Sequence, residues 1–252
     1  MILGIDIGGS GVKGAPVDLG AGALAAERYR VTTPQPSDVD RILHAAAEVA
    51  GQFDRPERIG VTFPGVVVGG VIQTAANVDK SWVDAPAARL FTEALGCPVT
   101  VLNDADAAGI AEVTYGAGRD RPGVIILLTF GTGIGSALFI DGRLVPNTEL
   151  GHLEMHGREA EARASDRARD VENLDWPHWA SRVQEYLRHV EFLFQPDLFI
   201  IGGGVSRKAD RFIPLLKTRT PVVPAALQNS AGIIGAAVAA AATQVADAPS
   251  GA

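Results

Sequence analysis

The chain has 252 residues, of which 47% are hydrophobic and 20% charged, and its formal net charge is −7. This composition is typical of a globular protein with one compound domain or two small ones, and the negative charge gives no general attraction to nucleic acid or acidic membranes. Cys97 is the only cysteine, which excludes an intramolecular disulfide and a zinc site made of several thiolates. The N-terminus shows no basic segment ahead of an apolar one, and the longest apolar run (231–242) is shorter than the roughly 20 residues of a bilayer span. We therefore expect a cytoplasmic protein.

The first predicted structure is a hairpin with a glycine-rich bend. Residues 2–7 form an apolar strand pattern, Gly8-Gly9-Ser10-Gly11 follows, and residues 12–17 resume an extended pattern. The glycine spacing also fits a dinucleotide-binding fingerprint, but Pro16 and the turn after it leave no room for the helix that such a site requires. The loop is not a P-loop either, because no Ser or Thr follows Lys13.

This loop has two interpretations. Its backbone N–H groups can approach a phosphate, with Asp6 near a metal ion and Lys13 as a counter-charge, or it can be an ordinary hairpin turn. A second copy of the pattern has a strand over 124–130, the loop Gly131-Thr132-Gly133-Ile134-Gly135 and a strand over 136–140. The repetition favours phosphate binding and indicates two related halves.

Helices and strands alternate along the rest of the chain. Ser37 is predicted to cap a helix that runs to about residue 53, and Asp175 with Pro177 is predicted to start another. The remaining predicted elements are strands over 59–63, 98–102 and 197–201, helices over 85–95, 105–115 and 231–245, and a helix from about Ser206. This alternation predicts an α/β fold of two lobes, 1–103 and 104–230, with a cleft between them. The sequence leaves open whether the last helix packs back on the first lobe, and residues 246–252 are expected to be a frayed tail.

Several of these segments carry a family resemblance. Residues 6–13, the loop 131–135 and Gly202-Gly203-Gly204-Val205-Ser206 resemble the phosphate and donor-site motifs of the ROK family of sugar kinases and repressors. Members of that family share the two-lobed actin and hexokinase fold, which belongs to the ribonuclease H-like group. Within the family, residues 76–82, 103–108 and 146–154 resemble the polyphosphate glucokinases. The resemblance covers nearly the whole chain.

The resemblance implies an activity and a set of site residues. The expected reaction transfers a phosphoryl group from inorganic polyphosphate, or also from ATP, to the 6-hydroxyl of glucose with Mg²⁺, in an enzyme that forms a homodimer. The residues implied for glucose are Gly65, Asn77, Asn103, Asp104, Glu149, His152 and Glu161. The residues implied for the phosphate donor are Asp6, Gly8, Gly9, Ser10, Gly11, Lys13, Gly131, Thr132, Gly133, Gly203, Gly204, Ser206 and Lys208, with Asp6 also expected to bind Mg²⁺.

Asp104 is the predicted catalytic residue. An aspartate at a helix start commonly serves as a cap, but the family motif implies a general base that accepts the proton of the sugar hydroxyl. The adjacent helix N-terminus favours the ionised carboxylate, which can accept a proton late in a phosphoryl transfer.

The segment around His152 departs from the larger family. The cysteines that hold zinc near this histidine are missing, so no zinc is expected, and either Glu161 or Glu154 could supply the third acidic sugar contact. His152 and His156 are four residues apart, as in a metal hydrolase, but the glutamate between them has the wrong offset and Gly151 disfavours a helix.

Two further alternatives concern the donor and the function class. The cations Arg207, Lys208, Arg211, Lys217 and Arg219 could form a track for a long polyanion or could be a solvated helix face, and Lys80 could serve the other side of the cleft. The alternatives to a polyphosphate glucokinase are a kinase that uses only ATP, a glucomannokinase, and a sugar-binding or regulatory protein without catalysis. The sugar-responsive repressors of the family carry an N-terminal DNA-binding segment, which we do not expect here.

Overall fold

The structure is a computed structural model that describes residues 1–75 and 78–247. It divides into two compact units, Met1–Ala111 together with Ser230–Ala252, and Glu112–Asn229. Each unit has its own sheet and its own hydrophobic core, and the predicted α/β fold class is confirmed. The predicted boundary at residue 103 lies directly before α3 (Asp104–Thr114), whereas the units divide inside this helix.

The sheet of the first unit is six-stranded, in the order β3-β2-β1-β5-β8 with β4 also paired to β2. β1 and β2 form the predicted antiparallel hairpin, while β1, β5 and β8 run parallel. The strands are β1 (Ile2–Gly8), β2 (Gly11–Asp18), β3 (Ala23–Leu24), β4 (Tyr29–Val31), β5 (Arg58–Phe63) and β8 (Val99–Asn103), and a small hairpin consists of β6 (Val67–Val68) and β7 (Val71–Ile72). The helices are α1 (Val39–Ala50), the 3₁₀ helix η1 (Lys80–Trp82), α2 (Ala87–Leu95), the first part of α3, and α7 (Ala231–Asp247).

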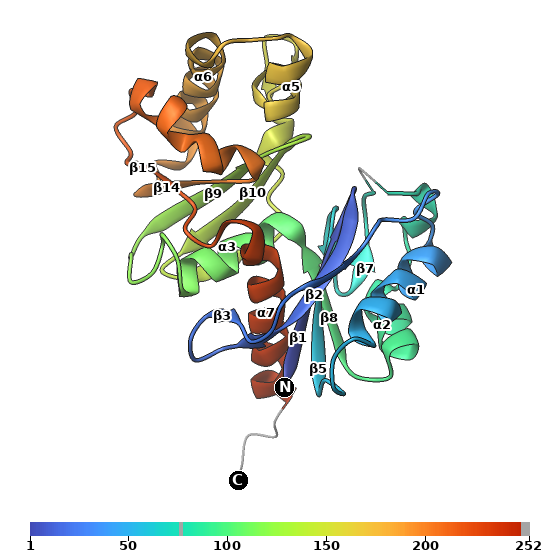
Figure 1. The fold of residues 1–252 in the computed structure, drawn as a ribbon. Helices are drawn as coiled ribbons and strands as arrows, with labels where there is room; N and C mark the ends of the chain where they lie inside the picture. The colour runs from blue at the N-terminus through green and yellow to red at the C-terminus, as the bar shows by residue number, and fades with distance from the viewer. Residues whose placement is uncertain (76–77, 248–252) are drawn as a thin grey trace. The chain divides into compact units, whose positions relative to one another are not determined.

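Alternate residues of β1 face opposite sides of this sheet, as the period of a strand requires. Leu3, Ile5 and Ile7 are fully buried in a core that includes the apolar faces of α1 and α2. On the other face, a Cβ at Gly4 would lie 1.9 Å from the carbonyl oxygen of Ile233 in α7. Figure 1 shows α7 on one side of β1 and β5, and α1 and α2 on the other. The last helix therefore packs on the first unit.

The N-cap of α1 differs from the prediction. Asp38, and not Ser37, is the capping residue, and its carboxylate accepts the backbone N–H of Arg41 at 3.0 Å. The Ser37 hydroxyl instead accepts the backbone N–H of Asp79 at 3.2 Å, and the helix ends at Ala50. Both residues are of types that cap helices, so only the tertiary contact with residue 79 distinguishes them.

The sheet of the second unit is five-stranded, in the order β11-β10-β9-β14-β15. β9 and β10 form the second predicted hairpin, and β9, β14 and β15 run parallel. This order repeats the topology of the first sheet, as the repeated strand–glycine–strand pattern predicted. The strands are β9 (Val124–Phe130), β10 (Ile134–Ile140), β11 (Arg143–Val145), β14 (Leu198–Gly202) and β15 (Val222–Pro224), with a small hairpin of β12 (Glu154–Met155) and β13 (Arg158–Glu159). The helices are α4 (Glu161–Ala164), α5 (Asp166–Val171), α6 (Trp176–Phe194), and the 3₁₀ helices η2 (Leu150–His152), η3 (Gly204–Arg211), η4 (Ile213–Leu215) and η5 (Gln228–Ser230), the last of which ends at the first residue of the other unit.

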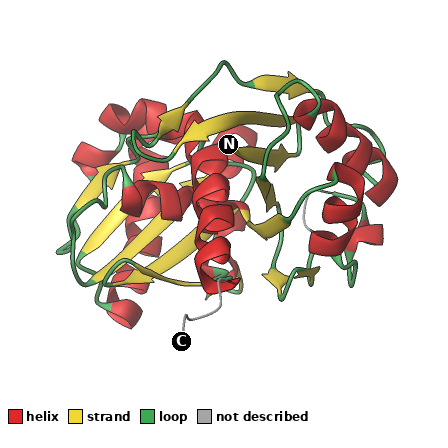
Figure 2. Cartoon of the chain, turned by 90° about the horizontal axis from the view of Figure 1, so that it is seen from below, coloured by secondary structure: helices red, strands yellow, loops and turns green. Residues whose placement is uncertain are grey.

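Helix α6 supplies six of the buried residues in the core of the second unit. It starts as predicted, with the Asp175 carboxylate accepting the backbone N–H of His178 at 2.9 Å. Trp179 and Tyr186 of α6 are buried and meet the ring of Phe130 edge to face. Among the described residues no helix is long and apolar enough to cross a membrane. This holds for the apolar helix α7 as well, whose end lies near the C label in Figure 2.

The predicted helix near Ser206 is a 3₁₀ helix, η3, and the backbone angles of Lys208 inside it are not helical. Gly203 precedes it with φ 78°, and a Cβ at this glycine would lie 2.5 Å from the carbonyl oxygen of Phe130. The chain therefore passes close to the end of β9 as it leaves β14.

The five predicted cations of this region also do not form one cluster. Arg207, Lys208 and Arg211 belong to η3, which follows the C-terminal end of β14. Arg219 instead lines a shallow cavity together with Asp197, which precedes the N-terminal end of the same strand. Strand β14 has 5 residues, so its two ends lie roughly 15 Å apart.

Candidate active site

The first glycine loop, Gly8–Gly11, joins β1 to β2 beside a row of polar side chains. The Asp6 carboxylate accepts the Thr62 hydroxyl at 2.7 Å and pairs with the Lys13 ammonium at 2.9 Å. The strand register explains the row, because Asp6 lies opposite Thr62 in β5 and opposite Lys13 in β2. The Asp6 and Lys13 side chains are 17% and 24% exposed, so a charged ligand at the loop can reach both.

Asp104 lies at the first turn of α3, directly after β8. The Asn103 side-chain oxygen accepts the backbone N–H groups of Ala105 and Asp106 at 2.8 and 3.1 Å, which makes Asn103 the N-cap. The Asn103 amide in turn donates to the carbonyl oxygen of Gly65 at 3.1 Å. Asn103 is 6% exposed whereas Asp104 is exposed, so the buried amide fixes the helix start and presents the carboxylate at the surface of this unit.

The second glycine loop, Gly131–Gly135, is held by hydrogen bonds from two helices. The carboxylate of Glu161 in α4 accepts the backbone N–H of Ile134 at 3.0 Å, and the carbonyl oxygen of Gly131 accepts the backbone N–H of Arg167 in α5 at 3.0 Å. A Cβ at Gly133 would lie 2.3 Å from a carboxylate oxygen of Glu161, so glycine is required for this close contact. Glu161 therefore positions the loop.

The segment Glu149–His152 lies directly against the strand that follows this loop. The Ser136 hydroxyl donates to the carbonyl oxygen of Thr148 and accepts the backbone N–H of Leu150 at 3.0 Å. A Cβ at Gly151 would lie 2.1 Å from the carbonyl oxygen of Ile134. Glycine at position 151 and a small hydroxyl at position 136 thus place the Glu-x-Gly-His motif beside the second loop.

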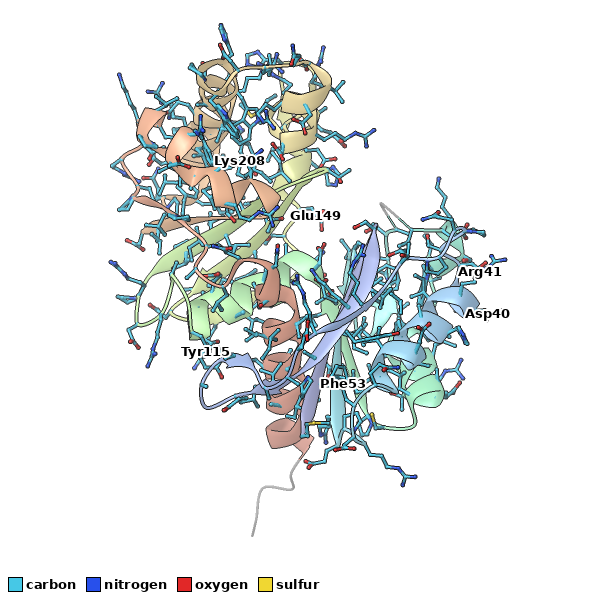
Figure 3. All side chains as sticks on the ribbon, viewed as in Figure 1. Asp40, Arg41, Phe53, Tyr115, Glu149 and Lys208 are labelled. Atoms are coloured by element: carbon cyan, nitrogen blue, oxygen red, sulfur yellow. The ribbon has the colours of Figure 1, made fainter. Side chains whose placement is uncertain are left out.

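The charged groups of this segment interact with one another. The His152 imidazole lies 3.5 Å from the Glu149 carboxylate and 3.1 Å from the Glu159 carboxylate. Burial, reinforced by the negative charge of Glu161, raises the pKa of Glu149, and the nearby His152 opposes this shift. Glu149, which is labelled in Figure 3, therefore combines a carboxylate that is harder to ionise with a neighbouring imidazole. Such a pair can both donate and accept hydrogen bonds, as recognition of sugar hydroxyls requires.

Comparison with known proteins identifies the family. The ROK family model matches residues 2–169. The chain belongs to the ROK family. A polyphosphate glucokinase of Mycobacterium tuberculosis is 54% identical over 237 residues, which cover 94% of this chain and 89% of that protein. A polyphosphate glucokinase of Mycobacterium leprae is also 54% identical, over 94% of this chain and 73% of its own length.

Solved structures agree with this assignment. The inorganic polyphosphate/ATP-glucomannokinase of Arthrobacter sp. strain KM superposes with a TM-score of 0.93 at 51% identity, covering 96% of this chain and 98% of its own. A ROK family glucokinase from Streptomyces griseus, solved with glucose and AMPPNP, has a TM-score of 0.80 over 96% of this chain and 99% of its own. At 24% identity the second likeness shows the fold alone. The predicted two-lobed kinase fold is thereby confirmed.

Two groups of this ROK protein bear on metal binding. Asp6 is a single carboxylate whose two oxygens already contact Thr62 and Lys13, and each oxygen has a further lone pair. This suits Mg²⁺, which proteins commonly bind through one or two carboxylates with donor phosphates and water. In the described part of the chain, His152, Glu159 and Glu161 are the one group of three side chains whose ligating atoms lie within 4.8 Å of one another. Two of these three are exposed, and exposed acidic groups are common without a metal.

The structure brings the predicted ROK site residues together within each unit. Gly65, Asn103 and Asp104 are neighbours in the first unit, and Glu149, His152 and Glu161 are neighbours in the second. Asn77 lies outside the described residues. Glu154 lies opposite Glu159 in the small hairpin and does not belong to the group formed by His152, Glu159 and Glu161.

Among the donor residues, Gly203 packs on Phe130 at the start of the second loop. Ser206 is buried, and its hydroxyl donates to the carbonyl oxygen of Gly203 at 2.8 Å. Lys208, which is labelled in Figure 3, is exposed on η3. Its ammonium lies 5.7 Å from the centre of the Trp176 ring.

The sequence analysis missed two contacts of the first glycine loop and one contact of His152. Thr33 donates its hydroxyl to the carbonyl oxygen of Gly8, and Arg30 donates to the carbonyl oxygen of Ser10. Glu159 lies beside His152. No motif marks these residues, because each contact depends on strand pairing or on a hairpin whose register the sequence does not specify.

Proposed function

We propose that this ROK protein is a glucokinase that transfers a terminal phosphoryl group from inorganic polyphosphate, and also from ATP, to the 6-hydroxyl of glucose. The observation that carries the proposal is the 54% identity to curated polyphosphate glucokinases over 94% of the chain. The glucomannokinase of Arthrobacter, at 51% identity and a TM-score of 0.93, supports both donors. The two glycine loops, each closed by side-chain contacts, are consistent with binding of a phosphate donor.

Asp104 is the proposed general base. Asn103 caps α3, and the Asp104 carboxylate also accepts the backbone N–H of Ala105 at 2.8 Å, which fixes its orientation. We propose that this oriented carboxylate receives the proton of the 6-hydroxyl. The neighbouring helix N-terminus favours the anion until the proton is transferred. Phosphoryl transfer needs little covalent chemistry from the protein, so positioning and electrostatic stabilisation supply the rest.

The proposed sugar contacts come from the residues that the family resemblance implied. Asn77, Asn103, Glu149, His152, Glu161 and the backbone near Gly65 offer amide, carboxylate and imidazole groups to the hydroxyls. Glu161 has one oxygen on the backbone of Ile134, so its other oxygen is the one offered to the sugar. In this way one side chain serves both the second loop and the acceptor.

The proposed donor site uses the two glycine loops, and Asp6 is the proposed Mg²⁺ ligand. A bound Mg²⁺ would neutralise the charge that develops on the donor phosphates. Lys13 forms an ion pair with Asp6 and therefore partly neutralises the negative charge of the proposed Mg²⁺ ligand. Homodimer formation and a cytoplasmic location remain predictions from the sequence, and light scattering of the purified chain tests the first of them.

Replacing Asp104 tests the proposed mechanism. Asp104→Asn should lower kcat by about 10² to 10⁴, the range for loss of an acid–base group, with the unfolding transition unchanged. Asp40→Asn is the matched control, because Asp40 is also an exposed aspartate in the first turn of a helix of the same unit (Figure 3). An Asp104→Asn variant with wild-type turnover would contradict the assignment.

A donor and acceptor matrix tests the substrates. Formation of sugar 6-phosphate is measured with polyphosphate and with ATP, each against glucose and mannose. Activity with mannose would favour the second candidate, a glucomannokinase, which the Arthrobacter likeness supports. Glucose binding without turnover on either donor would instead indicate a sugar-binding protein without catalysis.

A further inference from the structure

The polar row beside the first glycine loop continues beyond the residues that the family resemblance implied. In the antiparallel pairing of β2 with β4, Lys13 lies directly opposite Arg30. Residues directly opposite in such a pair project from the same face of the sheet. Asp6, Lys13 and Arg30 are therefore consecutive positions on one face of β1, β2 and β4.

The two cations of this row differ in their charge balance. Lys13 pairs with Asp6 at 2.9 Å, so its charge is compensated within the protein. In the part of the chain that the structure describes, no carboxylate lies within ion-pair distance of Arg30, whose side chain is exposed. The uncompensated positive charge at this loop is therefore that of Arg30.

Contacts with the loop backbone fix the Arg30 guanidinium. One terminal N–H donates to the carbonyl oxygen of Ser10 at 2.6 Å. A Cβ at Gly11 would lie 2.4 Å from Nε and 2.8 Å from the guanidinium carbon, so the group rests on the bare backbone of this glycine. An arginine side chain carries five N–H donors, and the bond to Ser10 uses one of them. The guanidinium is thus preorganised at the loop with donors remaining for an anion.

From this geometry we infer that Arg30 binds a phosphate oxyanion of the phosphoryl donor at the first glycine loop. The inference rests on the proposed function and adds a residue to it. A planar guanidinium matches a phosphate group in a bidentate manner, and a charged donor gives a stronger hydrogen bond than a neutral one. Gly11 has a second role here, because a side chain at this position would displace the guanidinium.

Direct binding measurements test Arg30 without requiring turnover. Isothermal titration of wild type and Arg30→Gln with tripolyphosphate, and separately with AMPPNP, gives the affinity for each kind of donor. We expect Arg30→Gln to weaken binding about tenfold to a hundredfold, the range for loss of one charge-assisted hydrogen bond. Glucose affinity should stay at the wild-type value, and the unliganded melting temperature should fall by no more than the loss of the single hydrogen bond to Ser10 explains.

Arg28→Gln is the matched control. Arg28 is an exposed arginine two residues earlier, for which the described structure gives no ion pair, and its loss changes the net charge equally. It should leave donor affinity unchanged. Arg30→Lys, which keeps the charge but not the planar fork, should bind donor with intermediate affinity.

Each outcome of these titrations has a defined meaning. Weaker binding of both donors supports a contact with an oxyanion common to them, and weaker binding of only one identifies the donor whose phosphate lies at Arg30. Unchanged affinity for both, or an equal loss in Arg28→Gln, overturns the inference. If wild type binds donor and Arg30→Gln does not, but glucose is never phosphorylated, the oxyanion site stands while the proposed kinase function fails.

Discussion

The contact between Glu161 and the second glycine loop can be tested through stability alone. The carboxylate accepts the backbone N–H of Ile134 at 3.0 Å, and a Cβ at Gly133 would lie 2.3 Å from the same oxygen. The substitution Gly133→Ala must therefore displace the carboxylate, which is the mobile end of a side chain. Gly133 is not among the glycines with positive φ, so alanine causes no backbone strain of its own.

The magnitude follows from the hydrogen bond. A hydrogen bond to a charged group contributes about 1.5 to 3 kcal/mol, and Glu161→Ala removes it. Gly133→Ala should cost a similar amount in the wild-type background, reduced by the roughly 0.4 to 1 kcal/mol that alanine gains by restricting the unfolded chain. In the Glu161→Ala background no carboxylate is present to collide with the new methyl group. Gly133→Ala should then be neutral or stabilising, with a coupling of about 2 kcal/mol between the two sites.

The assay is a double-mutant cycle. Urea denaturation of wild type, the two single variants and the double variant gives four free energies of unfolding. Equal costs of Gly133→Ala in both backgrounds would refute the reasoning, because the carboxylate would then not be what the methyl group meets. Since the readout is unfolding, the result does not depend on whether the chain is a kinase.

Three other substitutions have defined outcomes. Glu112 is fully buried, and its carboxylate accepts three backbone N–H groups at 2.7 to 3.0 Å, so Glu112→Ala should lower the free energy of unfolding in urea by about 3 kcal/mol or more. Gly60→Ala should lower the free energy of unfolding by about 1 to 3 kcal/mol or more, because its Cβ would lie 1.9 Å from the carbonyl oxygen of Ala236. Gly131→Ala is the control in the same urea denaturation, since a Cβ at Gly131 has nothing within 4 Å. Burial raises the pKa of Glu149 above its ordinary value of 4.5, so the folded state holds this proton at higher pH than the unfolded chain does. The wild type should therefore lose stability relative to Glu149→Gln as the pH rises from below 4.5 toward the raised pKa, and a constant difference across that interval would contradict the shift.

The sequence was sufficient for the order of elements and for the repeated halves, because both follow from apolar periodicity and glycine punctuation. The hairpin of β1 and β2 and that of β9 and β10 were predicted with nearly correct bounds. The cap of α1 was not predicted correctly, because Ser37 and Asp38 are both of types that cap helices. The contact of Ser37 with Asp79, which is distant in the sequence, decides between them. The helix expected from about Ser206 is a 3₁₀ helix in the structure. The contact of Gly203, which precedes it, with Phe130 of β9 is likewise a tertiary feature that no local pattern encodes.

The site residues show the same division between local and tertiary information. Asn103 and Asp104 are adjacent in the sequence, and their distinct positions follow from the end of β8 and the start of α3. Arg30 could not be found in this way. Its place beside Lys13 depends on the pairing of β2 with β4, which lie on opposite sides of a turn and of the short strand β3. Register of this kind is set by packing and turn geometry together, and no short motif encodes it.

The two hairpins share a topology but differ in the chemistry around their loops. At the first loop the positions across the sheet are Asp6, Lys13 and Arg30, so fixed charges accompany the backbone N–H groups. In the second hairpin the position of β10 that pairs with Leu128 is Ser136, whose hydroxyl is used to hold the Glu-x-Gly-His segment. The two hairpins therefore have similar backbones but differ in their side chains, which are charged at the first loop and bind the Glu-x-Gly-His segment at the second. If both loops bind the donor, the first binds it mainly through charge, and its contribution to affinity weakens with added salt more than that of the second.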